Sequence, residues 1–129
     1  MKSIGYPERQ DVQTPRLEIR DLTRRFDGKP VVDGVSLSIQ PGHVTCLLGP
    51  SGCGKSTLGK CVVRLNQPTG GEVLYDGTDL APLKRKELKP YRRDLQMVFQ
   101  DPVESLNARH TIGEILAEPF IIHGIGDRE

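Results

Sequence analysis

The stretch "LLGPSGCGKSTLGK", residues 47 to 60, places glycine, proline, lysine and hydroxyl side chains between an apolar run and a helical pattern. The apolar run "VTCLL", residues 44 to 48, shows little alternation, as expected of a strand buried on both faces of a parallel sheet. After the glycines, apolar residues recur at the spacing of one helical face: Leu58, Cys61, Val62 and Leu65. The predicted local order is therefore strand, glycine-rich turn, helix.

The glycine-rich turn fits the P-loop pattern, in which a glycine is followed after four residues by glycine, lysine and serine or threonine. The matching residues are Gly49, Gly54, Lys55 and Ser56. Glycines let successive backbone N–H groups point inward without Cβ clashes, which makes a concave nest of donors for phosphate oxygens. The helix that begins near Gly54 adds its positive N-terminal end. We therefore expect the turn to bind a nucleoside triphosphate.

Side chains in and after the turn are suited to the same ligand. Lys55 can reach the β and γ phosphates, Ser56 is placed to ligate Mg²⁺, and Thr57 can donate another hydrogen bond. The alternative is a glycine-rich strand-to-helix turn without a ligand. The predicted nucleotide-binding residues of the turn are Gly49, Pro50, Ser51, Gly52, Cys53, Gly54, Lys55, Ser56 and Thr57.

The segments on either side of this motif predict the strands of an antiparallel sheet. "RLEIRDL" at 16–22 and "VVDGVSLSI" at 31–39 alternate apolar and polar residues, and the turn pair Asp27 and Gly28 lies between them. "EVLYDG" at 72–77 predicts a further strand that closes on an Asp-Gly turn. Strands with one buried face, combined with the strand and helix around the glycine turn, predict an α/β fold.

The second half of the chain carries weaker signals. "KRKELKPYRR" at 84–93 is a basic run without interleaved aromatics beyond Tyr91, so a solvated surface segment is favoured over a nucleic-acid site. "LQMVF" at 95–99 predicts another short strand. Thr111 and Glu114 form a capping box ahead of an apolar helix face, which Pro119 is expected to stop or kink.

Composition is that of an ordinary globular domain. The 129 residues carry a formal net charge of +1, with 27% charged and 36% hydrophobic residues. This balance gives no global reason to expect nucleic acid as a partner. No apolar run approaches the ~18 residues needed to span a bilayer, and no signal peptide is recognisable. Residues 1–14 are polar and predict a loose N-terminal tail, and the chain is expected to be cytoplasmic.

Three cysteines, Cys46, Cys53 and Cys61, are odd in number and contain no CxxC pair. Neither a disulfide framework nor a zinc site is indicated, and reduced thiols are expected. Cys46 and Cys61 fall in apolar patterns, where a free cysteine behaves as a small hydrophobe. Only Cys53, inside the glycine turn, is expected near chemistry.

With the P-loop in place, "GVSLSIQPGHVTCLLGPSGCGKST" followed by "MVFQDP" resembles the nucleotide-binding subunits of ABC transporters. The resemblance begins near Leu17 and covers nearly the rest of the chain. The strings "STLGKCVVRLNQPTGGEVLYDG", "LQMVFQDPVESLNAR" and "TIGEILAEPF" are most similar to the ATPases of oligopeptide and dipeptide importers. Ala108 stands where those proteins usually have proline, away from the nucleotide.

The resemblance implies a fold and further site residues. It implies a P-loop NTPase core of ABC type at 15–100, with an N-terminal antiparallel β region, and the start of a helical subdomain at 101–129. Phe26 is implied to stack on the adenine of ATP, the alternative being a core phenylalanine at a strand end. Gln100 is implied to contact Mg²⁺ and the attacking water, the alternative being a plain loop glutamine. Lys55 and Gln100 are then the expected catalytic residues.

The resemblance also implies partners. The ATPase would couple ATP binding and hydrolysis to uptake of peptides or related solutes. It would act with transmembrane permease subunits, a second ATP-binding subunit and, indirectly, a solute-binding protein. It would lie on the inner face of the cell membrane. No nucleic-acid partner is expected.

Several features of that family are absent from the sequence. There is no "LSGGQ" string, no apolar strand ending in the Walker B aspartate with a glutamate after it, and no switch histidine, since His110 and His123 precede any such strand. We therefore interpret the chain as the N-terminal part of such an ATPase, incomplete at its C-terminus, whose strand at 44–48 lacks parallel neighbours. The alternatives are a non-hydrolysing nucleotide-binding remnant and a different P-loop enzyme, such as a small-molecule kinase.

Overall fold

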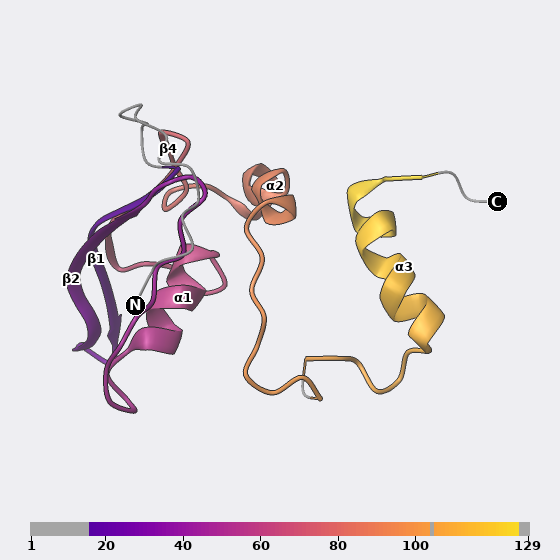
Figure 1. Cartoon of the computed structure of the whole chain (residues 1–129), viewed down its shortest axis with the longest axis horizontal. Coiled ribbons are helices and arrows are strands. Elements are labelled where there is room, and N and C mark those ends of the chain that lie inside the picture. Colours follow the sequence, from indigo (N-terminus) through magenta and orange to yellow (C-terminus); the bar gives the residue numbers. More distant parts are fainter. Residues whose placement is uncertain (1–15, 104, 127–129) are drawn as a thin grey trace, which may run out of the picture. The chain divides into compact units, whose positions relative to one another are not determined.

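The computed structural model describes residues 16–103 and 105–126 (Figure 1). These residues fall into two compact units, with the boundary after Leu83, and each unit is described by itself. The tail predicted at 1–14 lies outside the described residues.

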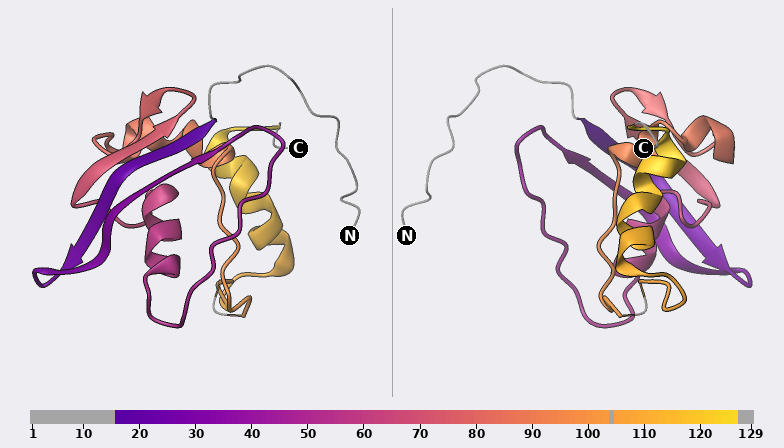
Figure 2. Two further views of the ribbon diagram at one scale, coloured as in Figure 1. Left: turned by 60° about the vertical axis from the view of Figure 1, so that its left-hand side comes forward. Right: turned by 90° about the vertical axis from the view of Figure 1, so that its right-hand side faces the viewer.

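The first unit is built on a four-stranded antiparallel sheet. Its strands are β1 (Leu17–Phe26), β2 (Lys29–Ile39), β3 (Gly70–Tyr75) and β4 (Thr78–Asp79), in the order β2-β1-β3-β4. One helix, α1 (Lys55–Val62), packs on one face of the sheet against β1 and β2 (Figure 2). The antiparallel β region predicted from the alternating segments is therefore confirmed.

The core of this unit lies between α1 and the sheet. Leu22 of β1, Val73 of β3 and Cys61 of α1 are fully buried, and Leu58 is 6% exposed. The predicted apolar helix face is thus correct for Leu58 and Cys61. It was predicted one turn too long, because the helix ends at Val62 and the following Arg64 adopts a left-handed backbone with φ 58°.

Arg64 also anchors the chain after the helix. Its Nε donates to Leu80 O at 2.9 Å and its Nη2 to Leu83 O at 3.0 Å. The guanidinium is buried, and these charge-assisted bonds offset the loss of its hydration. The arginine therefore fixes the segment that follows β4.

The turn between β1 and β2 confirms the predicted Asp27-Gly28 pair. Both residues have positive φ, 48° and 77°, as a two-residue turn matched to the strand twist requires. β1 also contains register shifts between Leu22 and Arg24 and between Arg24 and Arg25. Such irregularities re-aim side chains, and here they precede Phe26 at the strand end.

The strand predicted at 44–48 is wrong for this structure. The segment has no strand pairing, and Val44 and Leu48 are 92% and 95% exposed. A central parallel strand exists only between hydrogen-bonded neighbours, and none of the described segments pairs with it.

The strand predicted at 95–99 is wrong for the same reason. This segment forms no ladder with any described strand, and Val98 is 97% exposed. A short apolar run forms a strand only when the edge of a sheet is available for it to pair with.

The second unit contains α2 (Arg85–Leu88), the 3₁₀ turn η1 (Tyr91–Arg93) and α3 (Ile112–His123). The predicted capping box of α3 is confirmed: Glu114 N donates to Thr111 Oγ1 at 3.3 Å, and Thr111 N donates to Glu114 Oε2 at 2.7 Å. The bonds from Thr111 lower the pKa of Glu114. The capping box therefore stabilises the helix fully at pH values above the ordinary pKa of glutamate. This contribution is lost as the pH falls through the lowered pKa of Glu114.

The helix does not stop at Pro119. It continues to His123 and ends at Gly124, which is left-handed with φ 63°. An interior proline removes one backbone hydrogen bond and crowds the carbonyl four residues earlier, so it disfavours a helix without always ending it. Within the described residues, no helix is both long enough and apolar enough to cross a bilayer.

Candidate functional site

The glycine-rich turn closes on itself and on the β1–β2 hairpin. Cys53 N donates to Pro50 O at 3.3 Å, and Gly52 and Gly54 have φ of 80° and 98°, where only glycine is unstrained. A Cβ on Gly54 would lie 2.5 Å from Val31 O of β2. The turn therefore has a defined shape that the glycines alone permit.

Lys55, the first residue of α1, folds back over this turn. Its Nζ donates to Gly49 O at 2.5 Å and to Pro50 O at 2.9 Å, and lies 3.4 Å from Cys53 Sγ. The ammonium group is half-exposed rather than buried in the core. The ammonium group therefore lies at the turn on a flexible side chain. It can leave the backbone carbonyls and bind phosphate oxygens in their place.

The N-terminus of α1 is free to bind an anion. Its N-cap, Gly54, provides no side-chain hydrogen bond, and the first turn contains no acidic residue. The N-terminus of α3, by contrast, is already capped by Thr111 and Glu114. The first N–H groups of an uncapped helix need an acceptor, and the helix dipole favours a negative one.

The residues present therefore fit a phosphate-bearing ligand and its metal. The hydroxyl of Ser56 is exposed in the first turn of α1, and Thr57 follows it. Hydroxyl oxygen is a ligand that Mg²⁺ accepts alongside phosphate oxygens. The predicted turn residues 49–57 are thus brought together as one site within the first unit.

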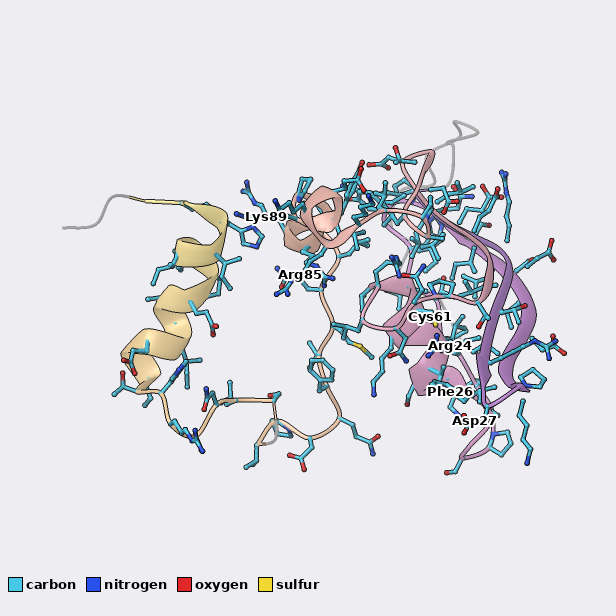
Figure 3. The ribbon with its side chains drawn as sticks, turned by 180° about the vertical axis from the view of Figure 1, so that it is seen from behind. Arg24, Phe26, Asp27, Cys61, Arg85 and Lys89 are labelled. Carbon is cyan, nitrogen blue, oxygen red and sulfur yellow. The ribbon has the colours of Figure 1, made fainter. Side chains whose placement is uncertain are left out.

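Phe26 lies at the end of β1 and is 41% exposed, so it is not part of the core. The guanidinium carbon of Arg24 lies over the ring, 4.5 Å from its centroid. Figure 3 shows Arg24 between Phe26 and Cys61 of α1. The alternative of a core phenylalanine is therefore not what the structure shows, and an open aromatic surface remains.

Gln100 belongs to the second unit, where it is exposed and lies outside any helix or strand. Its contact with Mg²⁺ and water stays a prediction. Its position after "MVF" is the only support that the described residues give it.

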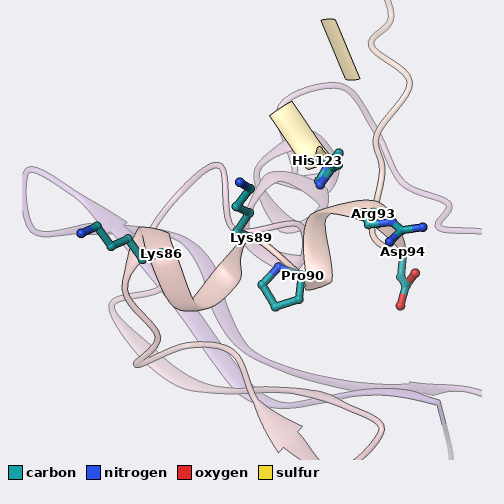
Figure 4. Close-up of a pocket in the computed structure, with 6 residues that line it drawn as sticks. All are labelled: Lys86, Lys89, Pro90, Arg93, Asp94 and His123. Atoms are coloured by element: carbon teal, nitrogen blue, oxygen red, sulfur yellow. The ribbon is translucent and has the colours of Figure 1, made fainter. Parts of the chain in front are cut away.

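The second unit also has a cavity of about 450 Å³ (Figure 4). Its lining residues are Lys86, Lys89, Pro90, Arg93, Asp94 and His123. Lys86, Lys89 and Arg93 are exposed, so their charges stay hydrated. This matches the solvated basic surface predicted for 84–93.

All three thiols are free. Cys46 and Cys53 are exposed, and Cys61 is buried. Burial raises the pKa of the Cys61 thiol, which the nearby charges of Arg24 and Arg64 oppose. Cys61 is therefore inaccessible to reagents, whereas Cys53 is open at the turn.

We expect a maleimide to alkylate Cys53 in the nucleotide-free protein and Mg-ATP to protect it. The thiol lies beside Lys55 Nζ, so a bound triphosphate would shield it. Mass spectrometry of the peptide that contains Cys53 measures the protection. In the Lys55→Ala variant the protection should disappear, and equal labelling of the unmodified protein with and without nucleotide would place Cys53 outside the site.

Sequence reasoning missed Arg24. The signal was available, because residues two apart on a strand share a face and Arg24 is two residues before Phe26. It could not be decisive, because arginine on a strand is usually solvated and the register shifts in β1 are not visible in the sequence.

Residues 32–126 match the family model described as "ABC transporter". The chain belongs to the ABC transporter family. The oligopeptide transport ATP-binding protein AppF of Bacillus subtilis is 41% identical over 84% of this chain and 37% of its own length. YkfD of the same organism, also named for oligopeptide transport, is 50% identical over 86% of this chain and 35% of its own length. This chain therefore spans less than two fifths of these relatives.

Solved structures agree with the fold. A bacterial ABC transporter cassette solved as a dimer, MJ0796, has a TM-score of 0.72 and 28% identity over 88% of this chain and 50% of its own. The cassette MJ1267, solved in an ADP conformation, has a TM-score of 0.56 and 30% identity over 61% of this chain and 31% of its own. The predicted fold class and family resemblance are both confirmed.

Proposed function

We propose that this chain carries the ATP-binding site of an ATPase that drives the import of peptides or related solutes. One observation carries the proposal: Lys55 Nζ is held at the carbonyls of Gly49 and Pro50, beside an α1 N-terminus with no cap of its own. An oligopeptide-transport name on the relatives supports the class of solute.

The proposed site binds ATP along its length. Backbone N–H groups of the turn and the Lys55 ammonium bind the triphosphate, and the Phe26 ring, which is 41% exposed, stacks on adenine. The Ser56 hydroxyl would hold Mg²⁺, which when bound neutralises charge that develops on the phosphates. Because phosphoryl transfer depends on positioning and electrostatics, Lys55 contributes to turnover as well as to binding.

Gln100 is proposed as the second residue of the catalytic set. Its amide can accept and donate at once, which suits a group that contacts both Mg²⁺ and the attacking water. The support is its position in "MVFQDP", after an apolar run and before the polar loop that leads to α3.

The proposed organisation is an ATP-binding core at 15–100 and the beginning of a helical subdomain at 101–129. In support, α3 leaves five large apolar side chains at least half exposed: Ile112, Leu116, Phe120, Ile121 and Ile122. A helix with this much exposed apolar surface requires a covering surface.

The proposed partners are transmembrane permease subunits, a second ATP-binding subunit and, indirectly, a solute-binding protein. The assembly would place this protein in the cytoplasm, on the inner face of the cell membrane. The peptide-transport relatives and the dimeric cassette support these proposals.

The test is uptake of labelled short peptides by cells of the producing organism from which this gene has been deleted. Uptake should be lost, and it should return with the unmodified gene but not with one that encodes Lys55→Ala. The Lys60→Ala gene is a matched control that should restore uptake, since Lys60 lies in the last turn of α1. Full uptake by the Lys55→Ala cells would contradict the proposal.

A further inference from the structure

Arg24 makes contacts in two directions from near the C-terminal end of β1. On one side its guanidinium carbon lies 4.5 Å from the centroid of the Phe26 ring. On the other side its Nη1 donates to Gln67 O at 2.6 Å. The side chain therefore connects the tip of the β1–β2 hairpin with the segment that follows α1.

The segment that receives Arg24 is itself fixed. Thr69 N donates to Thr23 O at 2.8 Å, and Arg25 N donates to Thr69 Oγ1 at 2.8 Å. Gln67 Nε2 donates to Ala81 O at 2.9 Å. These bonds lay residues 67–69 along β1 on either side of Arg24, so the carbonyl that Arg24 contacts is a rigid anchor.

Arg24 is not arranged to satisfy its own hydrogen-bonding capacity. Its Nε is buried and has no hydrogen-bond partner among the described residues. A buried donor without a partner destabilises a fold, so the placement of this side chain calls for another explanation. The position of the guanidinium carbon over the Phe26 ring supplies one, because a cation held over one face of an aromatic ring constrains that ring.

We propose that Arg24 is a positioning residue for the nucleobase: it covers one face of Phe26 and holds the ring so that the opposite face receives adenine. Because Arg24 also contacts Gln67, beyond the C-terminal end of α1, it fixes the ring relative to the helix whose other end carries the phosphate site. The inference rests on the proposed ATP site and adds a residue to it.

The geometry explains why the Phe26 ring needs a residue that positions it. Phe26 is 41% exposed at a strand end, next to a two-residue turn, where a ring without lateral contacts can change rotamer. A ligand that is held by a base at one end and phosphates at the other gains affinity only if the two subsites keep a fixed separation. Arg24 provides that fixed separation within the first unit.

The test compares a ligand that has a base with one that has none. Equilibrium dialysis of the purified full-length protein gives the Kd for labelled Mg-ATP, and competition gives the Kd for inorganic tripolyphosphate with Mg²⁺. Arg24→Ala should weaken ATP binding about 3- to 10-fold, the range for one lost stacking and ordering contribution, and leave tripolyphosphate binding unchanged. The Kd of the Arg24→Lys variant for ATP should lie between those of the unmodified protein and the Arg24→Ala variant, since lysine keeps the charge but has no planar guanidinium.

Two further variants make the result specific. In a Phe26→Ala background, Arg24→Ala should have no additional effect, because the ring that it positions is gone. Arg20→Ala is the matched control on the same strand, since Arg20 pairs with Glu18 and Glu72 at the surface. It should leave both dissociation constants unchanged.

Each other outcome overturns a definite statement. Equal weakening of ATP and tripolyphosphate, or an Arg24→Ala effect that persists without Phe26, would mean that Arg24 supports the fold only. An unchanged ATP affinity in both Arg24 variants would also reject the inference. Failure of the unmodified protein to bind either ligand would reject the proposed ATP site, and the inference with it.

Discussion

Replacing Lys55 with alanine is expected to weaken ATP binding about 10- to 100-fold, the value of one charge-assisted contact to phosphate. The ammonium lies at the turn, where it now bonds the carbonyls of Gly49 and Pro50. Its removal takes the positive side-chain charge from the turn and leaves the backbone N–H groups and the hydroxyls of Ser56 and Thr57. Inorganic tripolyphosphate should lose affinity by a similar factor, because the lost contact is to phosphate and not to the base.

Equilibrium dialysis with labelled Mg-ATP measures the change. Lys60→Ala should bind as the unmodified protein does, because this lysine lies at the opposite end of α1. The fold of the Lys55→Ala variant should be intact, since the hydrogen bonds of Lys55 Nζ lie at the exposed turn. Unchanged ATP affinity in this variant would remove the P-loop assignment.

Local sequence patterns were sufficient for the elements whose partners are near in sequence. The β1–β2 hairpin followed from alternation and from Asp27-Gly28, and the start of α3 from Thr111 and Glu114. Both depend on backbone geometry within a few residues. The segments at 44–48 and 95–99 depend instead on a parallel neighbour, which no local pattern can supply. Their apolar residues favour strand formation, but the strands predicted there are wrong, and Val44, Leu48 and Val98 are exposed.

In the candidate site, too, the sequence predicts the contacts between residues that are near in the chain and misses those between distant ones. Residues 49–57 are contiguous, so the pattern of glycines, Lys55 and Ser56 predicts the assembled turn directly. The support for Phe26 is not contiguous: Arg24 reaches it across a register shift and is anchored on Gln67, more than forty residues later in the chain. A sequence shows which side chains can stack on a ring, but not which ones the sheet brings to it.

Gly54→Ala is expected to lower the free energy of unfolding by about 2 to 5 kcal/mol and to weaken ATP binding more than tenfold. The left-handed φ of 98° alone costs a residue with a Cβ about 1 to 2 kcal/mol. The new Cβ would also lie 2.5 Å from Val31 O, a backbone atom of β2 that cannot turn aside as a side chain can. Overpacking of this kind adds about 1 to 3 kcal/mol.

Gly52→Ala is the matched variant, because Gly52 lies in the same turn with φ 80° but has no atom within 4 Å of its Cβ position. It should show the backbone cost alone, about 1 to 2 kcal/mol. Urea unfolding and ATP dialysis of both variants separate strain from steric overlap. If β2 holds its position, the Gly54→Ala overlap must displace the start of α1, together with Lys55 and Ser56, so stability and affinity should fall together. Equal losses in the two variants would mean that the contact between the turn and Val31 does not shape the site.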